Sequence, residues 1–135
     1  MLGKRKVRKN ALELLFGYEF NGDTDFEEYY NNAYDNFCCE DDEDESVKKL
    51  FIGVCENKED IDATISENLK DWKISRLSKV TLSIMRISVY EMKYTDIPHA
   101  VSINEAVELA KEYAEEKAPS YVNGVLNSIS KSLVK

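Results

Sequence analysis

Positive charge is concentrated at the start of this chain, where it could bind phosphate groups. Five of the 18 lysine and arginine residues fall within the first nine positions: Lys4, Arg5, Lys6, Arg8 and Lys9. On a helix, residues four apart are neighbours, so Lys4 lies beside Arg8 and Arg5 beside Lys9. The whole chain has a net charge of −8, which argues against general nucleic-acid binding. The sequence therefore predicts a local basic patch on an acidic protein.

The opposite charge is concentrated in residues 40–45, which read EDDEDE. This run has no glycine at its sixth position and lacks the spaced ligands of a calcium-binding loop. Acidic residues near a helix N-terminus complement the helix dipole. The run is therefore predicted to be a solvated loop that leads into a helix.

The residues needed for enzyme chemistry are scarce. His99 is the only histidine, and it follows Pro98 with no nucleophile nearby in the sequence. The chain has no glycine-rich phosphate loop and no HExxH metal motif. The three cysteines, at positions 38, 39 and 55, form no CxxC pair, which indicates reduced thiols. We expect no catalytic residue, no metal site, no cofactor and no small-molecule substrate.

The elements that must position these residues are predicted to be helices. With 5 glycines and 2 prolines in 135 residues, long elements with few turns are favoured. Apolar residues at helical spacing predict an all-α bundle of six to seven helices. The predicted helices cover residues 4–20, 25–37, 45–69, 80–94 and 103–115, and a last helix starts at Pro119. Gly53 and Gly124 lie inside predicted helices and indicate close helix crossings.

The helix over residues 80–94 is apolar nearly all round, as expected of a helix at the centre of a bundle. Arg86 is a cation within it, and we expect it to pair with Glu91 or Glu105. In the aromatic helix over 25–37, the shared face of Tyr30, Tyr34 and Phe37 favours core packing over a platform for base stacking.

A capping box is predicted at the start of the helix over 103–115. Ser102 can cap this helix, and Glu105 can reach back to the Ser102 backbone. Val101 and Ala106 stand at the two positions of a hydrophobic staple.

The chain shows no signal peptide and no apolar run near the roughly 18 residues of a membrane span. We therefore expect a cytoplasmic protein with no membrane partner.

Five segments in order resemble the NusB family of bacterial transcription antitermination factors. They are KRKVRKNALELLFGYEF, LFIGVCEN, IMRISVYEM, IPHAVSINEAVELAK and YVNGVL. The resemblance implies an all-α fold of two packed three-helix subdomains. Residues 1–135 would then form one RNA-binding domain, with subdomains of approximately 1–70 and 71–135.

The resemblance also implies a function. Family members bind the boxA RNA of ribosomal RNA transcripts together with the ribosomal protein NusE. They then join RNA polymerase and other Nus factors to suppress termination. The implied RNA-binding residues are the five N-terminal cations, Lys4, Arg5, Lys6, Arg8 and Lys9, with Tyr18, Arg86 and Tyr121. For the last three, packing or ion pairing remains an open alternative.

Two positions depart from the family pattern. Glu13 stands where glutamine is common and Phe16 where tyrosine is common, and Glu13 adds negative charge near the proposed RNA face.

Two other functions stay open: a helical adaptor that binds proteins alone, and an RNA-recognition subunit for an RNA-modifying enzyme.

Overall fold

A computed structural model describes residues 4–20, 25–34, 41–69 and 74–133. Within these ranges the chain forms seven α-helices, one 3-10 turn and no strand, which confirms the predicted all-α fold. The chain divides into two compact units, residues 1–56 and 57–135. The division falls earlier than the boundary expected near residue 70.

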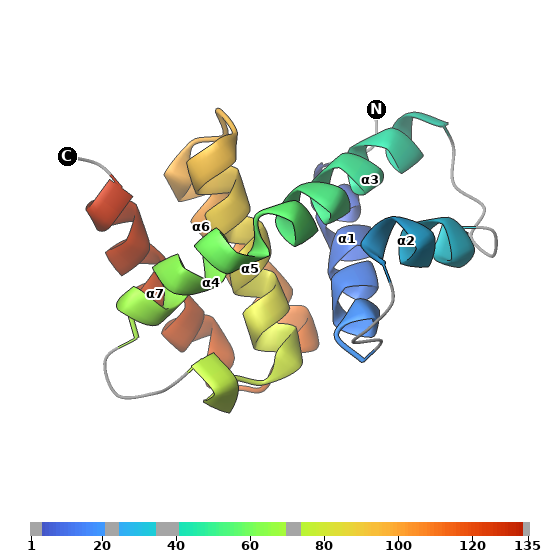
Figure 1. The fold of residues 1–135 in the computed structure, drawn as a ribbon. Coiled ribbons are helices and arrows are strands. Elements are labelled where there is room, and N and C mark those ends of the chain that lie inside the picture. The colour runs from blue at the N-terminus through green and yellow to red at the C-terminus, as the bar shows by residue number, and fades with distance from the viewer. Residues whose placement is uncertain (1–3, 21–24, 35–40, 70–73, 134–135) are drawn as a thin grey trace. The chain divides into compact units, whose positions relative to one another are not determined.

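The first unit contains α1 (Lys4–Tyr18), α2 (Phe26–Tyr34) and α3 (Asp41–Glu56), and each of these helices contacts the other two (Figure 1). Its core combines leucines of α1 with an apolar stripe on α3. The α1 leucines are Leu12, Leu14 and Leu15, and the stripe on α3 consists of Val47, Leu50, Phe51 and Val54. Tyr30 of α2 is also buried and stacks on Phe51, with ring centroids 6.0 Å apart. The prediction of core packing is therefore confirmed for Tyr30, while the side chains of Tyr34 and Phe37 lie outside the described residues.

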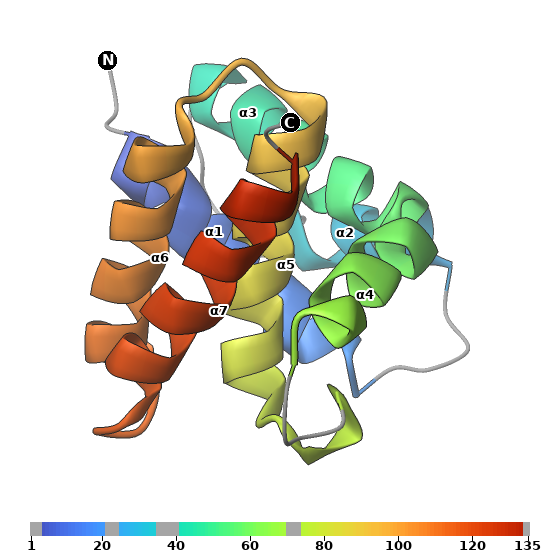
Figure 2. The same ribbon diagram turned by 90° about the vertical axis from the view of Figure 1, so that its left-hand side faces the viewer.

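The second unit contains α4 (Lys58–Glu67), the 3-10 turn η1 (Ile74–Arg76), α5 (Lys79–Tyr94), α6 (His99–Tyr113) and α7 (Ala118–Leu133). Figure 2 shows α5, α6 and α7 side by side in alternating directions. Every residue from Thr81 to Val89 is buried, and α5 contacts α4, α6 and α7. The prediction that this helix is central is thus confirmed within its unit.

The helix predicted over 45–69 is wrong, because two helices occupy this range. α3 ends at Glu56 and α4 begins at Lys58, with Asn57 between them. The apolar spacing continues across Asn57 from Val54 to Ile61, so the periodicity alone does not reveal the break. Asparagine has low helix propensity, which is consistent with its place at the junction.

The predicted capping box is also wrong. α6 begins at His99, directly after Pro98, and it has no side-chain cap. Ser102 therefore lies inside the helix, where it is buried, while Val101 of the predicted staple is 46% exposed. The Ser102 hydroxyl donates to Glu91 Oε1 at 2.9 Å and lies 2.8 Å from the Ser88 hydroxyl. Ser102 thus joins α6 to α5 instead of starting α6.

Candidate nucleic-acid interface

The N-terminal cations differ in exposure along α1. Arg5 and Lys6 are exposed, Lys9 is half-buried, and the side chain of Lys4 lies outside the described residues. Arg8 is only 3% exposed. Positions 8, 11, 12 and 15 share one helix face, so Arg8 lies on the same buried face as Ala11, Leu12 and Leu15. Among the N-terminal cations whose side chains the structure describes, Arg5 and Lys6 are therefore best placed to reach phosphate.

Two exposed phenylalanines lie at the end of α1 and in the turn that follows it. Phe16 is 39% and Phe20 is 62% exposed, and their rings meet edge to face with centroids 5.1 Å apart. The steps from Arg5 through Lys9 and Glu13 to Phe16 are three or four residues, which places these four along one stripe of α1. Phe20 lies in the turn that follows α1. Sequence reasoning did not assign Phe16 and Phe20 a binding role, although this spacing from the cations was a visible signal.

Tyr18 lies in an aromatic cluster, not on an open surface. Its ring centroid is 5.3 Å from that of Tyr29 and 5.9 Å from that of Phe51. Burial is the main cause that raises the pKa of Tyr18, followed by the nearby Cys55 and the carboxylates of Asp25 and Glu19. This geometry favours the packing alternative for Tyr18.

Arg86 is buried, and its side chain pairs with a carboxylate on a neighbouring helix. Its Nε and Nη2 atoms donate to the two carboxylate oxygens of Asp62 on α4, at 2.8 and 2.9 Å. Asp62 was not among the partners predicted for Arg86, and the pairing follows from the contact between α4 and α5. The two parallel hydrogen bonds hold the guanidinium in one orientation.

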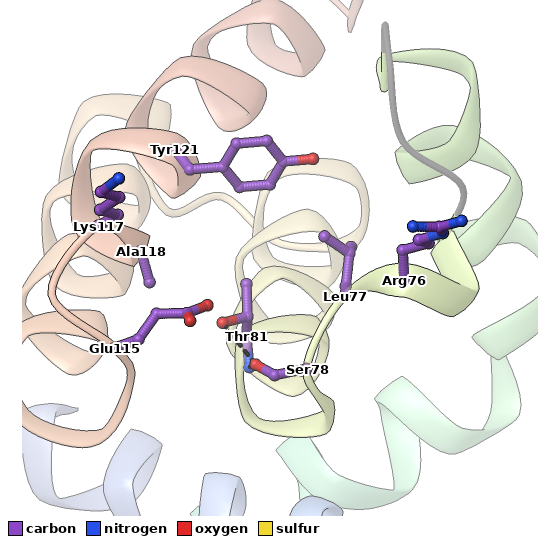
Figure 3. A pocket seen from close by; sticks show the side chains of 8 residues that line it. All are labelled: Arg76, Leu77, Ser78, Thr81, Glu115, Lys117, Ala118 and Tyr121. Atoms are coloured by element: carbon purple, nitrogen blue, oxygen red, sulfur yellow. Dashed lines mark hydrogen bonds between the residues drawn. The ribbon is translucent and has the colours of Figure 1, made fainter.

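Tyr121 lines a pocket of about 290 Å³ in the second unit. Figure 3 shows this pocket between η1, the first turn of α5 and the start of α7. Its lining residues are Arg76, Leu77, Ser78, Thr81, Glu115, Lys117, Ala118 and Tyr121. We call it the Tyr121 pocket. Sequence reasoning identified Tyr121 but missed the other residues, because they come from two segments that are distant along the chain.

The local sequence explains how α5 starts at this pocket. Ser78 is the N-cap residue, and its hydroxyl oxygen accepts from the Thr81 backbone N–H at 3.2 Å. The same hydroxyl donates to Thr81 Oγ1 at 2.9 Å. Burial raises the pKa of Tyr121 above its ordinary value.

The described part of the chain contains no cluster of three or more histidine, cysteine or carboxylate side chains that could hold a metal ion. Each helix described there is too short or too polar to span a lipid bilayer. Arg5, Lys6, Phe16 and Phe20 belong to the first unit, whereas Arg86 and the Tyr121 pocket belong to the second.

Comparisons with known proteins agree on one family. The NusB family model matches residues 5–131. Transcription antitermination protein NusB of Listeria monocytogenes serotype 4a (strain HCC23) is 46% identical over 128 residues, covering 94% of this chain and 95% of that protein. The structure of T. maritima NusB superposes with a TM-score of 0.87 at 33% identity, covering 96% of this chain and 92% of that one. A crystal structure of the antitermination factors NusB and NusE in complex with dsRNA has a TM-score of 0.79 at 29% identity, covering 96% of each chain.

Proposed function

This chain belongs to the NusB family, and on that premise we propose that it is a transcription antitermination factor. It binds boxA RNA of ribosomal RNA transcripts together with NusE and joins RNA polymerase and other Nus factors in the cytoplasm. It acts by assembling these partners and carries out no catalysis. The RNA complex of its structural relative NusB with NusE supports the choice of partners.

The observation that carries the RNA-binding part of this proposal is the exposed stripe on α1, together with Phe20 in the turn that follows it. Arg5 and Lys6 present positive charge to solvent, and Phe16 and Phe20 present aromatic surface. Cations attract the phosphates of a single strand, and exposed rings stack on unpaired bases. A single strand placed along this helix would meet both kinds of contact.

Not all the residues implied by the family resemblance fit this role equally. Lys9 is half-buried, so it contributes less than Arg5 and Lys6. Tyr18 and Arg86 act mainly by shaping their units, through the aromatic cluster and the bond to Asp62. Tyr121 contacts RNA through its pocket.

The test is a titration of boxA-like RNA with and without NusE at two salt concentrations. The double substitution Arg5→Ala and Lys6→Ala should weaken binding and reduce the slope of log affinity against log salt by roughly 0.7 for each lost phosphate contact. The matched control is Lys131→Ala, which removes an exposed cation from the last turn of α7. Lys131→Ala should leave the slope unchanged.

Other results would overturn the proposal. Equal slopes for the double variant and the wild type would exclude the α1 face as the RNA site. Absence of RNA binding even with NusE would favour an adaptor that binds proteins alone. Methyl transfer to ribosomal RNA by the chain itself would indicate an enzyme.

A further inference from the structure

A polar cluster joins the first turn of α4 to the last turn of α5 on the surface of the second unit. Asp60 of α4 accepts hydrogen bonds from Lys93 and Tyr94 of α5. Lys93 Nζ lies 2.7 Å from Asp60 Oδ2 and also donates to Thr64 Oγ1 at 2.9 Å. The Asp60 side chain is nevertheless 49% exposed. We call Asp60, Tyr90 and Tyr94 the Asp60 platform.

One carboxylate oxygen of Asp60 is open to a further donor. Lys93 and Tyr94 both donate to Oδ2, and no donor among the described residues reaches Oδ1. The Lys93 bond is the main cause that lowers the pKa of Asp60, followed by the Tyr94 bond, so the carboxylate is ionised at neutral pH. Each oxygen of an ionised carboxylate can accept hydrogen bonds. Oδ1 is therefore a charged acceptor that is held in place through Oδ2.

The ring of Tyr94 offers a second contact beside this oxygen. Tyr90 stacks on it, with ring centroids 5.5 Å apart and an interplanar angle of 27°. Tyr94 is still 43% exposed, so this packing leaves much of the ring in contact with solvent. The hydroxyl bond to Asp60 and the stacking on Tyr90 hold the ring in one orientation. A partner that binds such a preformed surface pays little entropy to order it.

An open carboxylate oxygen next to an exposed aromatic ring suits a guanidinium group. Arginine stacks its planar group on an aromatic ring and donates several N–H bonds in a fixed fork, whereas the lysine ammonium is a point charge. The charge of α4 favours a cation as well, because this helix contains one lysine and four carboxylates. Lys93 opposes a second cation, but its side chain is only 20% exposed.

We propose that the Asp60 platform is a docking site for a partner protein that presents an exposed arginine. The guanidinium of the partner stacks on Tyr94 and donates to Asp60 Oδ1. This inference goes beyond the proposed function, because the platform shares no residue with the RNA-binding stripe of α1 or with the Tyr121 pocket.

The first experiment titrates the full chain with three blocked tripeptides, N-acetyl-glycyl-X-glycine amide, in which X is arginine, lysine or citrulline. NMR spectra should show the tightest binding for the arginine peptide, with shifted amide signals from residues 59–61 and 93–95. Citrulline keeps the shape of arginine without its charge and should bind about two- to fivefold more weakly. Binding of the lysine or citrulline peptide as tight as that of the arginine peptide would overturn recognition of a guanidinium.

Substitutions test the two contacts separately. Asp60→Asn should lower the affinity for the arginine peptide by about two- to fivefold. Asp96→Asn is the matched control, because it removes an exposed carboxylate just after α5, and it should bind like the wild type. If both variants lose affinity equally, only the net negative charge of the chain attracts the peptide, and the proposal is wrong.

Two replacements of Tyr94 separate the ring from its hydroxyl. Tyr94→Leu removes the aromatic face and should lower the affinity for the arginine peptide by about two- to fivefold. Tyr94→Phe keeps the ring, and Lys93 still holds Asp60, so this variant should bind nearly as well as the wild type. Equal affinity of Tyr94→Leu and Tyr94→Phe would overturn the stacking contact.

Other occupants of the Asp60 platform predict different results. Sedimentation at increasing protein concentration tests for a second copy of this chain, and self-association that Asp60→Asn abolishes would assign the platform to that copy instead. Titration with boxA-like RNA should give equal affinities for Asp60→Asn and the wild type. A change in RNA affinity would place the platform in the RNA site and overturn a separate protein partner.

Discussion

The guanidinium of Arg86 on α5 forms two hydrogen bonds to the Asp62 carboxylate on α4, at 2.8 and 2.9 Å. The Arg86 side chain is 7% exposed and that of Asp62 is 26% exposed. The pair therefore fixes α4 against the central helix of the second unit. A charged group that is already held in this way has little freedom to reach an RNA strand.

Replacement of Asp62 by alanine should lower the free energy of unfolding by about 2–4 kcal/mol, because it leaves the Arg86 charge buried without this partner. Urea unfolding measures the loss. Asp96→Ala is the matched control, because Asp96 is an exposed carboxylate of the same unit. If Asp62→Ala loses no more stability than Asp96→Ala, the ion pair contributes nothing.

Ser102→Asp should be more destabilising than Ser102→Ala. Alanine removes the hydroxyl that bonds to buried Glu91 and should cost about 1–3 kcal/mol. Aspartate is as good an N-cap as serine, but here it would place a second carboxylate against Glu91. Thermal unfolding of both variants, with the exposed Ser120→Ala as control, gives the order. A stable Ser102→Asp protein would restore the capping interpretation.

These two cases show what the sequence could and could not predict. Helical periodicity predicted α5 to within one residue, because its apolar side chains surround the helix. The serine at position 102 followed by glutamate at 105 matches a capping box in one dimension. Its true partners, Ser88 and Glu91, come from the preceding helix and depend on how α6 packs against α5.

The candidate site divides in the same way. The cation cluster was evident from residue type and spacing, and Tyr121 followed from the resemblance to the NusB family. The burial of Arg8 depends on tertiary packing. So does the placement of Arg76 and Lys117 in the lining of one pocket. Arg76 and Lys117 are far apart in the sequence, so no local pattern joins them.

Gly17 and Gly124 should respond oppositely to alanine. A Cβ at Gly17 would collide with the Tyr29 hydroxyl, whereas a Cβ at Gly124 would meet nothing within 4 Å, so the close crossing predicted at Gly124 is wrong. Gly124→Ala should stabilise the protein by about 0.5–1 kcal/mol through helix propensity. Gly17→Ala should destabilise it by about 1–2 kcal/mol through overpacking.

The Tyr29→Phe background provides the check on Gly17, because it removes the colliding oxygen. Gly17→Ala should be less destabilising in that background, as measured by urea unfolding. An unchanged loss would show that the collision is not the cause.

Asp60 should make the free energy of unfolding depend on pH in the acid range. Its carboxylate accepts from Lys93 Nζ at 2.7 Å and from the Tyr94 hydroxyl. The Lys93 bond is the main cause that lowers the pKa of Asp60 below its ordinary value of 3.8, with the Tyr94 bond next. A lowered folded-state pKa adds stability above pH 3.8, and this stability is lost as the pH falls through the lowered value.

The measurement compares the wild type with Asp60→Asn from pH 7 to pH 2. The wild type should be the more stable above pH 3.8, and the difference should shrink below it. The bond to Asp60 raises the pKa of Tyr94 above 10, so Tyr94 stays protonated throughout and does not contribute to this change. A difference that stays constant down to pH 2 would contradict the assignment.

Arg5 and Arg8 should separate RNA binding from stability, although both are arginines of α1. Arg5 is exposed, so Arg5→Ala should reduce the salt slope of RNA binding by roughly 0.7 and leave stability nearly unchanged. Arg8 is 3% exposed, and its stem packs on the same face as Leu12 and Leu15. Arg8→Ala should therefore lower the free energy of unfolding by about 1–3 kcal/mol, with a smaller effect on the RNA affinity of the folded protein. The opposite result, an unchanged unfolding midpoint with a lost salt slope, would mean that Arg8 turns outward to bind RNA. Burial in the unbound protein would then not predict which cations contact the strand.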